Sequence, residues 1–249
     1  MTDINVLVIG ANSAIAEEIT KNFATKDNAN LFLVARNQAK LDAIADEMKV
    51  LGAKSIKKYY ADLTLLHNHQ NLIDQIFFDA GQKIDYIIIA HGSLSNEERA
   101  KTDIEYALSE INLNLNSYIS LSLLIANKLE NQKHGNLALI SSVAGDRGRS
   151  KICLYACAKS GITTLGQALS QRLHKNNINV LTVKPGVIDT PMTKTLKHSL
   201  LTGSSKNAGL DIYNAIKSRK KQIYTPWFWR IIMLIIRLLP QEIFLRTKF

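Results

Sequence analysis

Short apolar runs that alternate with longer amphipathic segments constrain the fold of this chain more than any other feature. The apolar runs lie at residues 6–9, 31–34, 56–61, 87–89, 137–140 and 180–183. The first three are followed by helical patterns at 14–26, 38–51 and 72–80. A run that is apolar at every position is typical of a strand buried on both faces, and intervening helices cover those faces of a parallel sheet. The sequence therefore predicts a single α/β domain with a doubly wound parallel sheet of the Rossmann type.

The positive charge of the chain is concentrated at one end. The 249 residues carry a formal net charge of +10, and about +9 of it lies between Lys194 and Phe249, where eleven Lys and Arg accompany only Asp211 and Glu242. This charge is interleaved with a long apolar run, and no nucleic-acid-binding motif is present. We therefore expect no nucleic acid partner.

Two cysteines and the first residues bear on the cellular compartment. Cys153 and Cys157 stand four residues apart and lack the spacing of a Cys-x-x-Cys redox pair. Reduced thiols are expected, with neither a disulfide nor a metal site. Residues 1–5 show no secretory signal pattern, so we expect a cytoplasmic protein.

The loop after the first apolar run is a candidate phosphate site. Ligands of doubly wound sheets lie outside the carboxyl ends of the strands. Gly10 permits a tight turn, and the loop leads directly into a helix whose first N–H groups are free to bind an anion. This predicts pyrophosphate contacts from Gly10, Asn12, Ser13 and Ile15. An ordinary strand-to-helix turn is the alternative.

Arg36 follows the second apolar run, where dinucleotide enzymes contact the adenosine ribose. No Asp or Glu is present there to bind a free 2′-hydroxyl group, whereas arginine suits a 2′-phosphate. The residue therefore favours NADP(H) over NAD(H), with a solvated loop arginine as the alternative.

Tyr155 and Lys159 form the most specific pattern in the chain. Their spacing places the phenol and the ammonium on one helix face, one turn apart. A nearby cation stabilises a phenolate and lowers its pKa, which makes tyrosine usable as an acid or base. Ser142 ends an apolar run thirteen residues earlier and can bring a hydroxyl group near the phenol.

In these motifs the sequence resembles the short-chain dehydrogenase/reductase family, over about residues 4–193. The resemblance implies an oxidoreductase in which Ser142 positions a substrate carbonyl and Tyr155 exchanges the proton. Lys159 would lower the tyrosine pKa and bind the nicotinamide ribose. Asn114 would hold a proton-relay water, with Asn112 and Asn116 as alternatives.

The resemblance also implies further cofactor contacts, most of them just after predicted strands. They are Asp62, Leu63, Ala90, His91, Gly92, Pro185, Gly186, Ile188 and Thr190. Asp62 would contact the adenine amino group, the Ile188 backbone the nicotinamide carboxamide, and Thr190 a phosphate. Similar enzymes form dimers or tetramers through helices that correspond to residues 114–128 and 155–174, which implies a homo-oligomer.

The chain departs from the family pattern at three positions. Ala14 and Ala16 replace the second and third glycines of the phosphate loop, and their methyl groups would narrow the approach of the pyrophosphate. His91 replaces an asparagine. It is expected to shape the strand end or line the cofactor cleft, and the alternative is a catalytic base.

The family core ends at residue 193, so residues 1–193 are expected to form the cofactor-binding and catalytic core. Residues 194–249 are expected to form a substrate-covering segment and a basic, apolar C-terminal helix within the same domain. The apolar run from Ile223 to Pro240 is interrupted by Arg230 and Arg237 and is too short to span a bilayer. It suits the interface of an anionic membrane, such as the inner face of the cell membrane. Packing on the body or between subunits is the alternative.

The tail, together with residues 90–92 and 142–148, resembles the keto-reductase half of decaprenylphosphoryl-ribose epimerase and its broader relatives. The leading hypothesis is therefore an NADP(H)-dependent reductase of a carbonyl on a hydrophobic substrate, with a polyprenyl-phosphate keto-sugar favoured. Reduction of an acyl, steroid or sphingoid carbonyl is the first alternative. A non-catalytic NADP(H) sensor or scaffold is the second.

Overall fold

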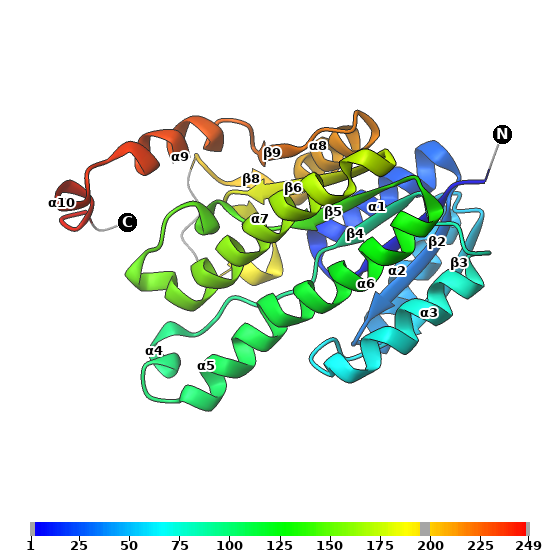
Figure 1. The fold of residues 1–249 in the computed structure, drawn as a ribbon, viewed down its shortest axis with the longest axis horizontal. Coiled ribbons are helices and arrows are strands. Elements are labelled where there is room, and N and C mark those ends of the chain that lie inside the picture. The colour runs from blue at the N-terminus through cyan, green and yellow to red at the C-terminus, as the bar shows by residue number, and fades with distance from the viewer. Residues whose placement is uncertain (1–2, 195–199, 248–249) are drawn as a thin grey trace.

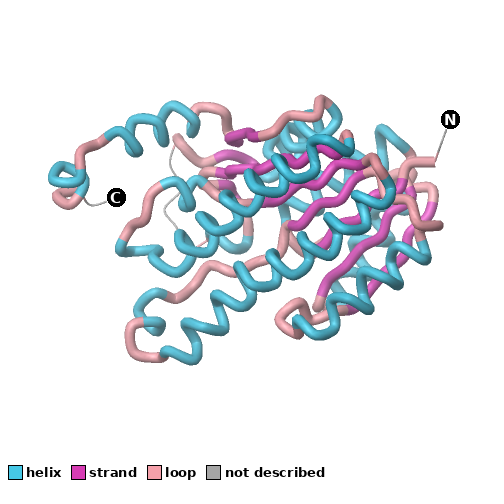
Figure 2. The backbone as a smooth tube through the Cα atoms, in the orientation of Figure 1, coloured by secondary structure: helices cyan, strands magenta, loops and turns pink. Residues whose placement is uncertain are grey.

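The computed structural model describes residues 3–194 and 200–247. Seven parallel strands form one sheet in the order β3-β2-β1-β4-β5-β6-β9 (Figures 1 and 2). These strands are β1 Asn5–Ile9, β2 Asn30–Ala35, β3 Ser55–Tyr60, β4 Tyr86–Ile89, β5 Gly135–Ile140, β6 Ile178–Pro185 and β9 Gln222–Thr225. The strand order reverses between β1 and β4, which confirms the doubly wound prediction and locates the expected ligand cleft.

Helices cover both faces of the sheet (Figure 2). The longer ones are α1 Ala14–Asp27, α2 Gln38–Val50, α3 His69–Asp79, α5 Ile104–Ile111, α6 Ser117–Gln132, α7 Cys153–Leu173, α8 Ser205–Lys217 and α9 Trp229–Leu238. The short elements are α4 Glu97–Ala100, α10 Gln241–Phe244, and the two-residue strands β7 Ile188–Asp189 and β8 Gly203–Ser204.

Alternate strand residues divide the core between the two faces. Val6 and Val8 join the cluster formed with α1, α2 and α8, whereas Leu7 and Ile9 join the cluster formed with α3, α6 and α7. Successive strand side chains point to opposite faces, so a strand covered on both sides needs apolar residues throughout. This explains why apolar runs of the sequence identified β1, β2, β4, β5 and β6, whereas β3 at the edge of the sheet is largely exposed.

The C-terminal segment differs from its expected form in two respects. The apolar run from Ile223 to Pro240 is not one helix, because β9 takes its first residues as the seventh strand and α9 begins at Trp229. In addition, α8 packs closely against α1 and buries Ile212 and Ile216 in the main core. Much of the expected substrate-covering segment is therefore part of the Rossmann layer structure.

Helix α9 follows the carboxyl end of β9 and extends with α10 away from the sheet (Figure 1). Its inner face packs Trp229, Met233 and Ile236 in a separate cluster with Val143. Within the part of the chain that is described, no helix has the length and apolarity needed to cross a membrane.

Candidate active site

The turn after β1 brings the first strand close to the fourth. Gly10 has a φ of +85°, and a Cβ atom there would lie 2.5 Å from the His91 backbone nitrogen. Glycine is therefore required both by its backbone conformation and by the close approach. Helix α1 starts four residues later, and its N-cap residue Ser13 makes no side-chain capping bond. The first N–H groups of α1 consequently point toward the cleft without a side-chain acceptor from Ser13.

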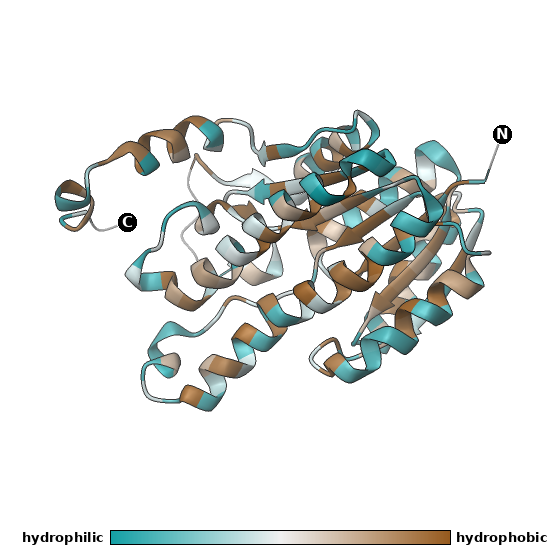
Figure 3. Ribbon diagram, in the orientation of Figure 1, coloured by the Kyte–Doolittle hydropathy of each residue, from teal (hydrophilic) through white to brown (hydrophobic). Residues whose placement is uncertain are grey.

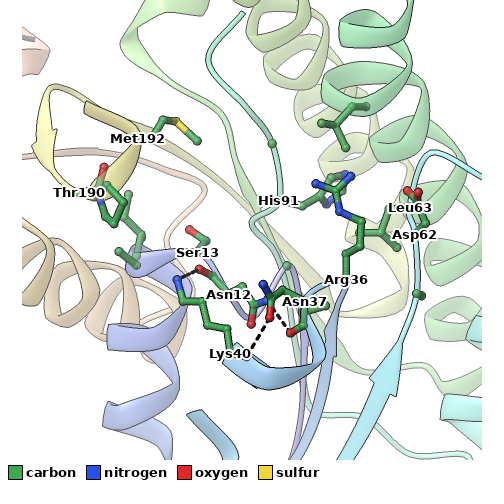
Figure 4. Close-up of a pocket in the computed structure, with 18 residues that line it drawn as sticks. Asn12, Ser13, Arg36, Asn37, Lys40, Asp62, Leu63, His91, Thr190 and Met192 are labelled. Atoms are coloured by element: carbon green, nitrogen blue, oxygen red, sulfur yellow. Dashed lines mark hydrogen bonds between the residues drawn. The ribbon is translucent and has the colours of Figure 1, made fainter. Parts of the chain in front are cut away.

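A cavity of about 410 Å³ lies at this end of the sheet (Figure 4). Ten of the predicted cofactor contacts line it: Gly10, Asn12, Ser13, Ile15, Arg36, Asp62, Leu63, His91, Gly92 and Thr190. They come from five separate strand ends, as expected for a site at the carboxyl edge of the sheet.

Lys40 lines the same cavity and was not identified from the sequence. Its ammonium donates to the Asn12 carbonyl oxygen over 2.6 Å, and the Asn12 amide donates to the Asn37 carbonyl oxygen. Asn37 also caps α2 by accepting from the Lys40 N–H. In Figure 4 the Lys40 side chain extends toward Asn12 and Ser13, whereas Arg36 lies on the side of the cavity where Leu63 and Asp62 are found. The sequence did contain a signal for Lys40, since a second basic residue follows Arg36 by four positions, in the first turn of α2.

A second, smaller cavity of about 80 Å³ contains the remaining predicted residues except Asn114. It is lined by Ser142, Tyr155 and Lys159 together with Ala90, Pro185, Gly186 and Ile188. Ser13, Ile15, His91, Gly92 and Thr190 line both cavities. The two cavities are therefore parts of one elongated cleft.

The Tyr155 phenol lies in an environment that opposes ionisation. Burial raises its pKa to about 12, and a hydrogen bond with Ser142 offsets part of that rise. Lys159 is 3% exposed, donates to the Ile140 carbonyl oxygen over 2.9 Å, and lies 5.5 Å from the centre of the Tyr155 ring. Burial lowers the pKa of Lys159 to about 7. The expected lowering of the Tyr155 pKa by Lys159 is thus not present in this structure, because burial disfavours the charged form of both groups.

Asn114 lies in a π-helical turn, Asn112–Asn116, between α5 and α6. Such turns are rare and occur frequently at functional sites. The Asn114 carbonyl oxygen accepts from the Ser93 N–H over 2.9 Å, and its amide donates to the Glu110 carboxylate over 3.3 Å. A Cβ atom on Gly92 would lie 2.7 Å from that carbonyl oxygen and 3.8 Å from the Lys159 ammonium. Asn114 therefore lies behind Gly92, next to the cleft but not in its lining, and Glu110 is a partner that the sequence did not reveal.

His91 shapes the strand end. Its ring stacks on Tyr118 with centres 4.3 Å apart, and its Nε2 atom is 2.6 Å from the Ser117 hydroxyl oxygen. Burial lowers its pKa to about 3, which makes it a poor base at neutral pH. The alternative role as a catalytic base is therefore disfavoured.

The two alanines of the phosphate loop occupy different surroundings. Ala14 lines the larger cavity, whereas Ala16 is fully buried in the main core and lines neither cavity. Only the Ala14 methyl group therefore faces the space in which a pyrophosphate would lie.

A family model described as short chain dehydrogenase matches residues 4–200. The chain belongs to the short-chain dehydrogenase family. It is 27% identical to an uncharacterized oxidoreductase of Mycobacterium tuberculosis, over 97% of this chain and 96% of that protein. It is 24% identical to a hydroxysteroid 11-beta-dehydrogenase 1-like protein of Gallus gallus, over 96% and 84% of the two chains. A short-chain dehydrogenase from Sphingobium yanoikuyae, solved with NADPH, superimposes with a TM-score of 0.81 at 20% identity, over 96% of this chain and 97% of that one.

This short-chain dehydrogenase has a buried ion pair beside the Ser142 loop that the sequence did not reveal. The Lys184 ammonium lies 2.5 Å from an Asp146 carboxylate oxygen, and both side chains are at most 4% exposed. The Tyr224 hydroxyl donates to the other oxygen of Asp146 over 2.7 Å. The pair therefore joins the Ser142 loop to the ends of β6 and β9.

Proposed function

We propose that this short-chain dehydrogenase uses NADPH to reduce the carbonyl group of a hydrophobic substrate. The observation that carries the proposal is the continuity of the cleft. At one end are the cations Arg36 and Lys40, and at the other are Ser142, Tyr155 and Lys159.

The residues of the larger cavity fit a dinucleotide phosphate. The start of α1 offers N–H groups to a pyrophosphate across the Gly10 turn. Arg36 and Lys40 both line this cavity and supply positive charge to which a 2′-phosphate is complementary. Solved proteins of the same fold carry NADPH in one case and NADP in another, which supports this assignment.

The chain's own groups suit the reductive direction. A nicotinamide held in this cleft would supply the hydride for the carbonyl carbon. With a pKa raised to about 12, Tyr155 is protonated at neutral pH and can give its proton to the carbonyl oxygen. Ser142 is hydrogen-bonded to Tyr155 and can hold the same oxygen. Lys159 stays in place through the Ile140 carbonyl group, and we assign to Asn114 the support of a water that returns the proton.

The walls near the smaller cavity favour an apolar substrate. Gly186 lines that cavity, and a Cβ atom on it would lie 2.0 Å from the Trp229 indole nitrogen, so α9 packs directly behind the cleft. Met192 and Ile188 add further apolar surface. A lipid-linked keto-sugar, as in the reductase half of decaprenylphosphoryl-ribose epimerase, remains our favoured substrate. The hydroxysteroid dehydrogenase-like relative equally supports another lipid carbonyl.

Replacement of Tyr155 by Phe tests the chemistry. The variant keeps the ring but removes the proton donor, so turnover of a lipid carbonyl should fall at least a hundredfold while NADPH still binds. Cys157→Ser, an exposed position on the same helix, is the control and should keep wild-type activity. Retention of most activity by Tyr155→Phe would refute this mechanism. NADPH binding without turnover of any carbonyl by the wild type would favour the sensor or scaffold role.

Fluorescence titration with NADPH and NADH tests the cofactor preference. Charge-assisted hydrogen bonds contribute about 1.5–3 kcal/mol, so Arg36→Ala and Lys40→Ala should each weaken NADPH binding about tenfold or more. Arg36→Ala should leave NADH binding nearly unchanged, whereas Lys40→Ala also removes the bond to the Asn12 carbonyl oxygen and should weaken NADH binding to a smaller extent. Lys49→Ala, at the far end of α2, is the matched control. If a variant loses affinity for NADPH and NADH equally, the replaced cation does not bind the 2′-phosphate.

A further inference from the structure

Helix α9 carries two opposed apolar faces. The inner face, formed by Trp229, Met233 and Ile236, packs against Val143. The outer stripe consists of Ile231, Leu234, Ile235 and Leu238, which are 52–73% exposed. Their spacing of three and four residues places them in one continuous line along the helix. Figure 3 shows α9 at the edge of the molecule as a mainly hydrophobic helix with two short hydrophilic segments.

Further exposed apolar residues flank the stripe along the chain. Trp227 before α9, and Ile243 and Leu245 in and after α10, are also more than half exposed. A concentration of exposed apolar side chains in one segment marks an interaction site. The surface lies on the carboxyl side of the sheet, where the candidate active site opens (Figure 1).

Positive charge borders the outer stripe on one side. Arg230 and Arg237 are both exposed and stand two helical turns apart on the same flank, and Arg246 follows α10. Helix α9 contains no acidic residue, and Glu242 is the one carboxylate side chain among the described residues from 226 to 247. A second copy of the chain would offer no complementary charge through α9, whereas an anionic lipid surface complements both the stripe and its arginines.

The orientation of this surface is held by Arg147, which follows the Ser142 loop. Its guanidinium donates to the carbonyl oxygens of Ile236, over 2.5 Å, and Leu239, over 2.7 Å, at the end of α9. It also lies 3.9 Å from the centre of the Phe244 ring in α10. The inner face and this clamp together keep the outer stripe directed away from the body.

We propose that the outer stripe of α9 inserts into the interfacial region of an anionic lipid bilayer. Helix α9 has ten residues, or about 15 Å, so it lies in the interface and does not span the bilayer. Trp229 on the opposite face of the helix packs behind the catalytic cavity, so docking brings the cleft close to the lipid surface. This inference rests on the proposed function and specifies it, because the substrate would then be a carbonyl on a lipid that stays in the membrane.

Vesicle flotation of the full chain tests the proposal. Wild-type protein should float with vesicles of phosphatidylcholine and phosphatidylglycerol at 0.1 M salt, and should bind pure phosphatidylcholine vesicles much more weakly. The double variant Leu234→Ser/Ile235→Ser should lower binding to the anionic vesicles at least tenfold. Arg230→Gln should lower it about fivefold, the loss expected for one basic residue near such a surface.

Two controls separate docking from folding and from function. Phe78→Ser changes an even more exposed apolar residue on α3, and this variant should float like the wild type. Thermal unfolding and NADPH titration of the double variant should match the wild type, because the altered side chains are exposed and lie outside the cleft.

The proposal is overturned if the wild type does not bind anionic vesicles or if the double variant binds them equally well. If the wild type does not bind vesicles and the double variant has a different oligomeric state, the stripe is a subunit interface and not a lipid-binding surface. Failure of flotation with intact NADPH-dependent turnover would refute only the docking surface. Flotation without NADPH binding would refute only the proposed function.

Discussion

Removal of one partner of the buried pair formed by Asp146 and Lys184 should lower the stability of the fold strongly. In Asp146→Asn, the Lys184 ammonium would stay in a site where it is 3% exposed but would lose the ion pair that it makes within the described part of the chain. Removal of one partner of a buried pair costs about 3–5 kcal/mol, because the remaining charge is desolvated without compensation. For a chain of this size we expect the melting temperature to fall by about 6–20 °C.

Urea denaturation of four proteins measures this effect. They are the wild type, Asp146→Asn, Lys184→Met and the double variant, which together form a double-mutant cycle. The double variant should be less destabilised than the sum of the single losses, since it leaves neither charge unpaired. Glu98→Gln removes one partner of the exposed pair with Lys101 and should leave the denaturation midpoint unchanged. A loss below 1 kcal/mol for Asp146→Asn, or strict additivity in the cycle, would show that the pair is not desolvated as the structure indicates.

Two further predictions concern the cleft itself. Gly92→Ala should lower kcat at least tenfold in steady-state assays with NADPH, because the residue has a φ of +145° and the new methyl group would collide with Asn114; a wild-type kcat would contradict this. The stability of the wild type relative to Lys159→Met should rise between pH 7 and about 10, by at most about 1.4 kcal/mol per pH unit. In that window the unfolded chain holds a proton that the folded lysine, with its pKa lowered to about 7, has lost. Urea titrations at several pH values measure the difference, and a parallel pH dependence of the two proteins would contradict it.

Strands β1, β2, β4, β5 and β6 were predictable because each is apolar on both faces. β3 forms one edge of the sheet and is largely exposed, and its Ile56, Tyr59 and Tyr60 gave the signal for a strand. β9 forms the other edge and was not predicted; it keeps an exposed Gln222 and half-buried Ile223 and Tyr224. In the sequence it also runs directly into the apolar residues of α9, and the whole run was therefore interpreted as one helix. A short strand next to a helix of similar composition lacks a periodicity of its own.

The candidate site was predictable where its residues are close in sequence or at strand ends. Tyr155 and Lys159 are one helical turn apart, and Ser142 lies two residues after the end of β5, so local spacing was sufficient. Asp146 and Lys184 are 38 residues apart, and Arg147 reaches carbonyl groups about 90 residues later. Contacts of this kind depend on how β6, β9 and α9 pack, which a single sequence does not specify.

The replacement of two glycines by alanine in the phosphate loop has unequal consequences. The third glycine of the family pattern serves close packing of the first helix, and Ala16 fills that position in the core with no exposed surface. On the other side of α1, α8 packs so closely at Gly209 that a methyl group on this glycine would collide with Glu18. Of the two replacements, Ala14 is the one that lines the cavity, so we expect an effect of the two alanines on dinucleotide affinity to come from Ala14.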